Sequence, residues 1–516
     1  MSFARPLVVG LALALTPVLT LPALADAPEL QKRFDDGAPA KVADRDVDLG
    51  ALKQFYSARG YRLAWSGASE SKGDRLLMDL QTVALAEGLA PEAYAVPPTS
   101  SDLDHDLLVT DALLRLGHDL AVGRLSGSKA FGGFGPEQRP NFEAKAYLSD
   151  LAAGRDLPAL AEALPPPYAG YQRLKLALEK YRQIARAGGW ATIPDGPSIK
   201  PGQEDERVPL VRKRLIATGE LAASHEKGRT LDAKVSEALR KFQSRHGLDI
   251  DGAVGRQTLA ALNVTADERV RQIMVNLERW RWMPRTLAPL HIAVNLPAAR
   301  LELVENGQVV KTMRVIVGDT KHPTPTMSAS MTSVVLNPTW TVPPSITTKE
   351  ILPKLKKDPN YLAANNMRFL DDGSRLRQQA GPDNALGQVK FNLRDSDDIY
   401  LHDTPKRQYF GRTSRALSHG CVRVERPVEL AEAVLGEPWA GTRVADTIEE
   451  SETRTVKIDR PLTVYLMYWT AWADGEGVVH FRDDLYGHDG RVKAALKRLR
   501  PSSASQVAEE SHRRPL

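Results

Sequence analysis

The spacing of apolar residues divides the chain into a helical half and a strand-rich half. From residue 26 to about residue 190, leucine and alanine recur at every third or fourth position, which is the period of an amphipathic helix. The helices predicted most clearly cover residues 74–86, 103–116 and 174–187. The aromatic residues of this half, which fit a core better than a sugar-binding platform, are Phe55, Tyr56, Tyr61 and Trp65. We therefore interpret residues 26–195 as a helical scaffold domain.

A second, smaller helical unit follows a linker rich in Gly and Pro at residues 188–197. Over residues 205–265, three short apolar stripes at helical spacing predict three helices. A turn rich in Asp and Gly separates the last two, and the side chain of Asp251 is suited to accept hydrogen bonds from the turn's backbone. The residues that define this turn are Asp251, Gly252, Gly255 and Thr258. On its own, the pattern requires no more than a connection between helices.

From Pro289 onward the pattern alternates between apolar and polar positions, as in half-buried strands. The dipeptide Asn306-Gly307 predicts a hairpin with a type I′ turn. We expect a mostly β domain over residues 287–446, interrupted at 343–387 by an insertion. In this insertion, Thr347 to Glu350 fit a capping box that opens a helix.

The two ends of the chain have different characters. Residues 1–25 combine Arg5, an apolar run and the small residues of Ala23-Leu24-Ala25, which predicts a cleaved export signal. The apolar run is short and broken by proline, so a stable membrane anchor is not expected. Residues 462–468 are β-branched and aromatic, which is typical of a buried strand. Residues 501–516 are polar and predicted to be disordered.

The composition and net charge of the chain limit the kinds of molecule that it is expected to bind. The 516 residues, 42% of them hydrophobic, are enough for several globular domains. A net charge of +5 and a sequence pI near 9.0 suit an anionic polymer. There is no clustered basic stripe, and export separates the protein from nucleic acid, so we exclude a nucleic-acid partner.

The only cysteine, Cys421, is the strongest candidate for chemistry. A single cysteine in an exported protein cannot form an internal disulfide. His419 stands two residues before it and His402 lies upstream in the same stretch, and an imidazole near a thiol is a common means of forming the nucleophilic thiolate. Two other interpretations are an inert core cysteine and a zinc site formed with both histidines. The zinc site lacks a CxxC pair and a fourth ligand, so we expect neither metal nor cofactor.

Residues 399–405 (IYLHDTP) and 418–423 (SHGCVR) together resemble the active-site signature of the L,D-transpeptidases, the YkuD or ErfK family, and in particular its large periplasmic YcbB-like type. The turn around Asp251 is similar to that of a three-helix peptidoglycan-binding module. Many relatives carry Asn at the position of Arg423, so the hydrogen bonds of that Asn are not transferred to this chain. The resemblance implies a multidomain α+β protein. Its parts would be a helical scaffold, a three-helix peptidoglycan-binding module and a mostly β catalytic domain with a lid inserted at 343–387. The resemblance also implies that residues 447–500 return to pack on the scaffold.

The resemblance also implies roles for individual residues. Cys421 would be the nucleophile and His402 the proton acceptor, while His419 and the backbone of Gly420 would shape the oxyanion pocket. The residues expected to contact substrate are Ser418, Arg423, Tyr400 and Trp340. The substrate would be the tetrapeptide stem of peptidoglycan in the periplasm, attacked at its third residue with loss of the terminal D-alanine.

The acyl acceptor stays open at this point. It would be an amine of a second stem, giving a 3-3 cross-link, or an amine of an outer-membrane protein or lipoprotein, or water. With water as acceptor the enzyme would be a thiol L,D-carboxypeptidase. A non-catalytic peptidoglycan-binding protein is the alternative of a different class.

Overall fold

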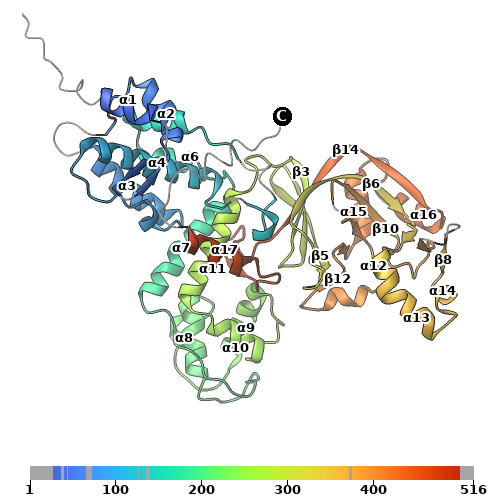
Figure 1. Ribbon diagram of the computed structural model, residues 1–516. Coiled ribbons are helices and arrows are strands. Elements are labelled where there is room, and N and C mark those ends of the chain that lie inside the picture. Colours follow the sequence, from blue (N-terminus) through green and yellow to red (C-terminus); the bar gives the residue numbers. More distant parts are fainter. Residues whose placement is uncertain are drawn as a thin grey trace, which may run out of the picture.

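The structure is a computed structural model, and it describes residues 27–36, 40–43, 45–65, 72–125, 127–134, 140–370, 373, 375–396 and 398–499. The predicted export signal and the predicted disordered tail lie outside these residues. Figure 1 shows an N-terminal helical body, a small helical body below it and a strand-rich body on the opposite side, with α11 and α17 near their meeting point. This arrangement confirms the predicted multidomain α+β fold with its helical and β-rich parts.

The N-terminal body is a helical scaffold built around one long helix. The central helix, α4 (Asp102–Val122), starts at Ser101, whose hydroxyl accepts a hydrogen bond from the Asp104 N–H, and it is buried along most of its length. Phe55 and Trp65 are each 1% exposed, so the prediction that these aromatic residues belong to the core is confirmed. The other elements of this body are α1 (Ala27–Asp35), β1 (Ala40–Val42), β2 (Arg45–Val47), α2 (Leu49–Ala58), α3 (Lys72–Ala86), η1 (Pro91–Tyr94), η2 (Lys129–Phe131), α5 (Ala144–Ala152), α6 (Leu157–Ala163) and α7 (Ala169–Arg186).

The small body has a core of its own, made by three helices and a short η4. Its elements are α8 (Val208–Thr218), η4 (Ala223–His225), α9 (Ala233–His246) and α10 (Arg256–Asn263). Part of the predicted linker belongs to this core, because Ile193 within it and Ile199 just beyond it are buried there. The side chain of Asn263 holds the segment in place by bonding to both the N–H (2.8 Å) and the carbonyl (2.9 Å) of Ile193.

The turn between α9 and α10 is held by Gln243, a residue that the sequence pattern did not single out. The Gln243 amide donates to Asp251 (2.7 Å) and to Thr258 (3.2 Å), and its oxygen accepts from the N–H of Gly252 (2.8 Å). Gly252 has a φ of +73°, and a Cβ there would lie 2.4 Å from the Ser236 hydroxyl. Gly252 and Thr258 are buried, whereas Asp251 is exposed, so a binding role for this run stays a prediction.

Helix α11 (Ala266–Arg281) joins the bodies through buried polar contacts. Glu278 accepts a hydrogen bond from the Leu125 N–H of the scaffold (2.9 Å). Asn276 bonds to the hydroxyl (2.8 Å) and the N–H (3.0 Å) of Thr470, and Arg279 pairs with Asp489 (2.6 Å). One helix therefore ties the scaffold to the C-terminal part of the chain.

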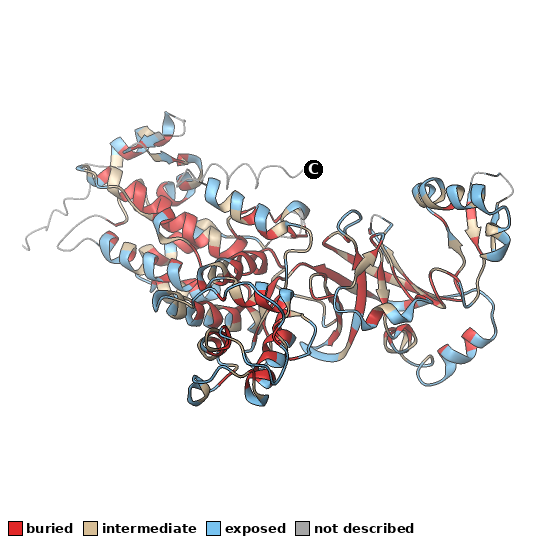
Figure 2. Cartoon of the chain, turned by 90° about the horizontal axis from the view of Figure 1, so that it is seen from below, coloured by how far each residue is buried: buried red, intermediate tan, exposed pale blue. Residues whose placement is uncertain are grey.

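The strand-rich body is organised by a nine-stranded sheet in the order β12-β5-β13-β11-β10-β6-β14-β3-β4, and because β4 also pairs with β5 the sheet closes on itself. Figure 2 shows buried residues inside this sheet and along the scaffold helices. The turn at Asn306 (φ 49°) and Gly307 (φ 79°) confirms the predicted hairpin. The strands are β3 (Leu290–Asn295), β4 (Arg300–Glu305), β5 (Gln308–Gly318), β6 (Met327–Leu336), β10 (Val389–Arg394), β11 (Leu401–His402), β12 (Ala416–Ser418), β13 (Val422–Val424) and β14 (Arg454–Met467).

The predicted C-terminal boundary of the β domain, at residue 446, is wrong. Strand β14 lies between β6 and β3 in the sheet, so the chain leaves the β domain only after Met467. Beyond it, β15 (Ala471–Ala473) and β16 (Val479–Phe481) share a core with α7 and α11. Three further helices are α15 (Pro427–Leu435), α16 (Arg443–Glu449) and α17 (His488–Arg498).

The insertion forms a small unit with its own apolar cluster around Val342, Ile351 and Leu376. Its helix begins at Pro344, and Thr347 lies inside it, so the predicted capping box is wrong. The elements are β7 (Trp340–Thr341), α12 (Pro344–Ile346), the π-helical η5 (Thr347–Ile351), α13 (Leu352–Lys357), α14 (Tyr361–Ala364), β8 (Met367–Phe369) and β9 (Leu376–Gln378), with η6 (Arg407–Gly411) in the following part of the domain. Within the described part of the chain, no helix has the length and apolar character needed to cross a bilayer.

Candidate active site

Cys421 lies in a tight turn between β12 and β13, and the turn is held from both sides. The Ser418 hydroxyl donates to the Cys421 carbonyl (2.6 Å) and accepts from the Gly420 N–H (3.2 Å). The Thr324 hydroxyl donates to the Gly420 carbonyl (2.6 Å). Gly420 has a φ of +114°, which favours glycine strongly. The sequence around the cysteine therefore fixes the direction of its backbone.

The donors available to an oxyanion differ from the sequence-based expectation in one respect. The N–H of Gly420 is already used by the Ser418 hydroxyl, so it is not a free donor. Among the described residues, the N–H of Cys421 has no acceptor. A preorganised, unused backbone N–H beside a nucleophile is the kind of group that stabilises a tetrahedral oxyanion.

His402 lies in a row of three residues that crosses three neighbouring strands. In the register of the sheet, His402 of β11 is opposite Lys390 of β10 on one side and opposite Arg423 of β13 on the other. The imidazole is 5% exposed, and its Nδ1 has no hydrogen-bond partner among the described residues. Burial, together with the positive charges of Arg423 and Lys390, lowers the pKa of His402 to about 3. The ring is therefore neutral at physiological pH, as a proton acceptor must be.

The thiol is protonated in the free protein. Burial raises the pKa of Cys421, while hydrogen bonding by Tyr400 and the charges of Lys390 and Arg423 act in the opposite direction. The thiol's hydrogen-bond acceptor is the Asp398 carbonyl at 3.8 Å. The part of the chain that the structure describes contains no hydrogen bond between Cys421 and His402. Such bonds often tighten only when substrate is bound.

The two cations beside Cys421 give a testable pH dependence. Because the pKa of the thiol is raised, the rate of alkylation of Cys421 by iodoacetamide is expected to keep rising with pH above the ordinary thiol range. Lys390→Gln removes a charge that favours the thiolate, so the midpoint of the profile is expected to move to higher pH. The matched control is Arg443→Gln, at an exposed arginine on α16. A midpoint that is the same in all three proteins would contradict this electrostatic account.

The insertion contacts the same site at two points. Glu350 of η5 forms an ion pair with His419 (Oε1 to Nε2, 2.8 Å), and the His419 ring lies 4.6 Å from that of His322. Trp340 of β7 hydrogen-bonds to the Tyr400 side chain, which also contacts Cys421. The insertion thus reaches both flanks of the cysteine.

The structure brings most of the predicted site residues together. Around the turn it gathers Trp340, Tyr400, His402, Ser418, His419, Gly420, Cys421 and Arg423. It also adds residues that the sequence analysis missed, namely Thr324, Glu350 and Lys390. The one feature of the sequence that could have indicated Lys390 is its position inside an otherwise apolar strand. Thr324 and Glu350 come near the site only when the chain is folded, so no local sequence pattern indicates them. Asp251 and its neighbours lie apart, in the module.

Three family models match the chain. Residues 289–457 match the L,D-transpeptidase catalytic domain, YkuD; residues 50–178 match a scaffold domain; and residues 204–262 match a domain described as "Putative peptidoglycan binding domain". A curated relative from Haemophilus influenzae, named "Putative L,D-transpeptidase", is 36% identical over 267 residues. This match covers 46% of the chain and 53% of the relative, so the chain spans about half the length of that protein.

Solved L,D-transpeptidase structures are also similar to parts of the chain. One from Stackebrandtia nassauensis has 14% identity, covers 54% of this chain and 96% of that chain, and has a TM-score of 0.22. Another, from Xylanimonas cellulosilytica, has 18% identity, covers 53% and 98%, and has a TM-score of 0.18. TM-scores this low do not show a shared fold. The family assignment therefore depends on the family models and on the geometry of the site. Residues 289–457 are a catalytic domain of the L,D-transpeptidase YkuD family, in a chain that also carries a scaffold domain and a peptidoglycan-binding domain.

Proposed function

We propose that the protein is a peptidoglycan L,D-transpeptidase that uses Cys421 as its nucleophile. The only cysteine of the chain lies in a turn fixed by Ser418 and Thr324, inside a domain of this family, beside a buried neutral imidazole and two cations. This arrangement supplies a nucleophile, a proton acceptor and positive charge at one place.

The chemistry follows from these groups in two steps. In the first, His402 takes the proton of the Cys421 thiol, and the thiolate attacks the L-centre carbonyl of the third residue of a tetrapeptide stem. The backbone N–H of Cys421 donates to the oxyanion. The carbon–nitrogen bond to D-alanine then breaks, His402 returns the proton to the departing amine, and a thioester is left.

In the second step an amine of another stem attacks the thioester. A new carbon–nitrogen bond forms, the carbon–sulfur bond breaks, and the thiol of Cys421 is regenerated. The product is a 3-3 cross-link. The same thioester would yield a tripeptide with water, or a protein conjugate with an amine of an outer-membrane protein or lipoprotein.

Arg423 and Lys390 are suited to bind the carboxylates of the stem. The Nε of Arg423 is buried without a partner, and neither side chain forms an ion pair with a described residue. Guanidinium groups favour carboxylates because they can donate two parallel hydrogen bonds. A bound carboxylate would also offset the charge that lowers the pKa of His402, so substrate binding would make the imidazole a stronger base. Tyr400 and Trp340 would form the wall of this pocket.

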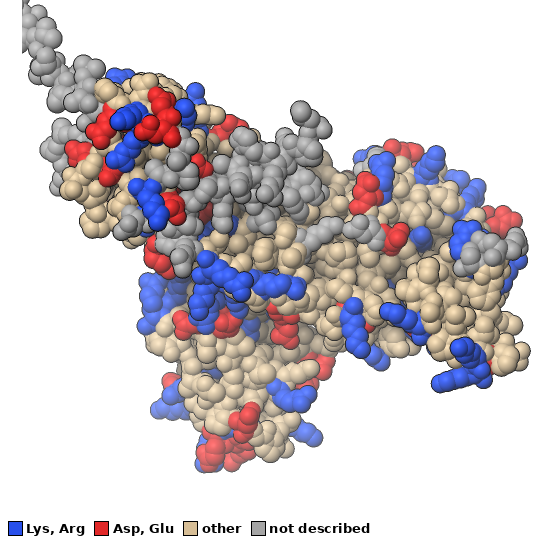
Figure 3. Space-filling view, viewed as in Figure 1, with Lys and Arg blue, Asp and Glu red and all other residues tan. Residues whose placement is uncertain are grey.

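We place the reaction in the periplasm, where its polymer substrate lies, in keeping with the signal-like pattern of residues 1–25. Acidic and basic side chains are mixed on the face shown in Figure 3, unlike a nucleic-acid-binding surface. The family model over residues 204–262 supports peptidoglycan as the polymer that the protein contacts.

The experiment that tests this function is the incubation of the mature protein with disaccharide-tetrapeptide, followed by intact-protein mass spectrometry. The expected result is a mass increase equal to the stem without its terminal D-alanine, mapped to Cys421 by proteolysis. A protein that releases no D-alanine and carries no adduct on Cys421 would contradict the proposal.

The insertion at residues 343–387 is proposed as a lid over the site, and the ion pair between Glu350 and His419 supports this role. Both side chains are about two-fifths exposed, at 39% and 42%, so the pair stabilises the closed lid only modestly. Glu350→Ala is therefore expected to raise KM for the tetrapeptide by about two- to fivefold. The control is Glu476→Ala, at an exposed residue between β15 and β16. Equal KM values in the two variants would contradict the role of the Glu350 contact.

A further inference from the structure

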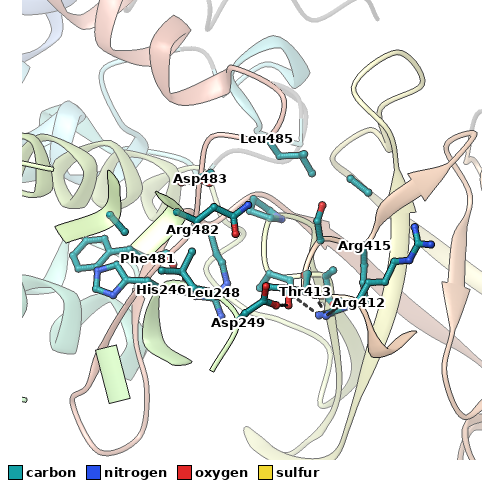
Figure 4. Close-up of a pocket in the computed structure, with 18 of the residues that line it drawn as sticks. His246, Leu248, Asp249, Arg412, Thr413, Arg415, Phe481, Arg482, Asp483 and Leu485 are labelled. Atoms are coloured by element: carbon teal, nitrogen blue, oxygen red, sulfur yellow. Dashed lines mark hydrogen bonds between the residues drawn. The ribbon is translucent and has the colours of Figure 1, made fainter. Parts of the chain in front are cut away.

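A large cleft lies between the module, the catalytic domain and the C-terminal segment, away from the lid. Its volume is about 1180 Å³, which is enough for a sugar-peptide fragment. Figure 4 shows labelled residues of all three parts around it. The module contributes His246, Leu248 and Asp249. The hydroxyl of Thr413 donates to Asp249, so the catalytic domain and the module touch directly at this cleft.

The walls of the cleft carry an excess of positive charge. Five arginines line it, namely Arg269, Arg314, Arg412, Arg415 and Arg482, whereas Asp249 and Asp483 are the only carboxylates among its lining residues. Glu425 pairs with Arg314. The other four arginines have no carboxylate within ion-pair distance among the residues that the structure describes. Four positive charges thus face the cleft without a paired negative charge.

Two of these arginines have donors to spare. Nη1 of Arg482 donates to the carbonyls of Arg245 (2.9 Å) and Phe481 (2.7 Å). The other N–H groups of this guanidinium have no acceptor among the described residues. Arg412 is exposed and lies over the Tyr409 ring, 4.4 Å from its centre, without a hydrogen-bond acceptor for its guanidinium. Arg415 differs, because its N–H groups are held by carbonyls, so it contributes charge only.

The charges in the cleft destabilise one another. Burial, and then the charges of Arg415 and Arg300, lower the pKa of Arg482 to about 10. Burial lowers the pKa of Arg415 as well, and the charge of Arg314 lowers it further. Arg269 is 6% exposed, and its Nε has no partner. An anion in the cleft would remove this repulsion, which is the energetic condition for an anion-binding site.

The position of the cleft indicates which anion it binds. On one side lies α10 of the module; on the other, Arg415 leads directly into β12 and the turn of Cys421. Leu248 and the 58% exposed Ile250 add apolar surface suited to a sugar face. We propose that the cleft binds the carboxylates of a peptidoglycan strand, with Arg482 and Arg412 as donors, and so holds that strand beside the catalytic domain. The choice of peptidoglycan rests on the proposed function, whereas the anion site does not.

The test is the binding of the full-length protein to insoluble peptidoglycan sacculi, measured by sedimentation in a Cys421→Ser background so that no turnover occurs. Ala260 is exposed on α10 and lines the cleft, so Ala260→Glu introduces a negative charge without disturbing the arginines. Ala260→Gln is the matched control of the same size. Ala260→Glu is expected to bind about tenfold more weakly than Ala260→Gln, and Arg482→Gln about tenfold more weakly than the starting protein, while the remote Arg443→Gln is expected to leave binding unchanged.

Two further arms identify the ligand. Sacculi whose carboxylates have been amidated are expected to bind the starting protein as weakly as native sacculi bind the Ala260→Glu variant. Citrate at the same carboxylate concentration is expected not to displace native sacculi; full displacement would show a general small-anion site and overturn the assignment. Equal binding by Ala260→Glu and Ala260→Gln would overturn the anion site itself. The release of D-alanine from soluble disaccharide-tetrapeptide by the Cys421 protein, measured in parallel, tests the proposed function separately.

Discussion

Replacing Cys421 with serine is expected to lower the rate of D-alanine release from disaccharide-tetrapeptide by at least about 10⁴-fold. A serine hydroxyl needs a much stronger base than a thiol, and the pKa of His402, about 3, makes that imidazole a weak one. The turn around position 421 is held by Ser418 and Thr324, so the variant should fold normally. The rate should be measured by quantifying free D-alanine, with the melting temperature as the check on folding.

A second variant, Cys421→Ala, is the companion to this measurement. Alanine removes the nucleophile without offering a hydroxyl, so both variants are expected to reach the same residual rate. A serine variant that kept more than about a tenth of the activity would show that Cys421 does not form the covalent intermediate.

Replacing Glu278 with alanine is expected to cost about 3–5 kcal/mol of the free energy of unfolding of the scaffold region. Glu278 is 1% exposed and accepts hydrogen bonds from the Leu125 N–H (2.9 Å) and the Trp282 indole (3.2 Å). It also pairs with Arg281 (3.3 Å), which is equally buried. The substitution leaves the Leu125 N–H and the Trp282 indole without this acceptor, and it removes the paired negative charge from the buried Arg281.

The matched control lies on the same helix. Glu268→Ala removes a glutamate of α11 whose side chain is 38% exposed, where it pairs with Arg271 and Lys493. Ion pairs at the surface contribute little, so a loss below about 1 kcal/mol is expected. Urea denaturation followed by circular dichroism compares the two variants. Similar losses in both would contradict the view that α11 ties the bodies together through buried polar contacts.

Local patterns in the sequence predicted much of the fold. The turn at Asn306-Gly307 was predictable because a type I′ turn requires positive φ at both positions. The helices of the module followed from their apolar spacing, and Cys421 and His402 stood out as residue types suited to thiol chemistry. These features depend on neighbours within a few positions, so one sequence contains enough information to predict them.

Features that depend on distant parts of the chain were not predictable in this way. Strand β14 pairs in parallel with β3, far away in the sequence, and this pairing moved the end of the β domain beyond residue 446. The polar residues of α11, such as Glu278 and Arg281, have the pattern of an exposed face but are buried as paired charges. Thr324 reaches Gly420 only because the sheet brings their loops together.

Transfer of the stem from Cys421 to an amine of a second stem is what distinguishes a transpeptidase from a hydrolase. The most direct measurement is mass spectrometry of the products formed from disaccharide-tetrapeptide by the mature protein and by its Cys421→Ser variant. The expected product is a cross-linked dimer that lacks one D-alanine, formed only by the protein with Cys421. Tripeptide without dimer would contradict transfer to a second stem and show a carboxypeptidase, and the absence of any product dependent on Cys421 would contradict the catalytic account altogether.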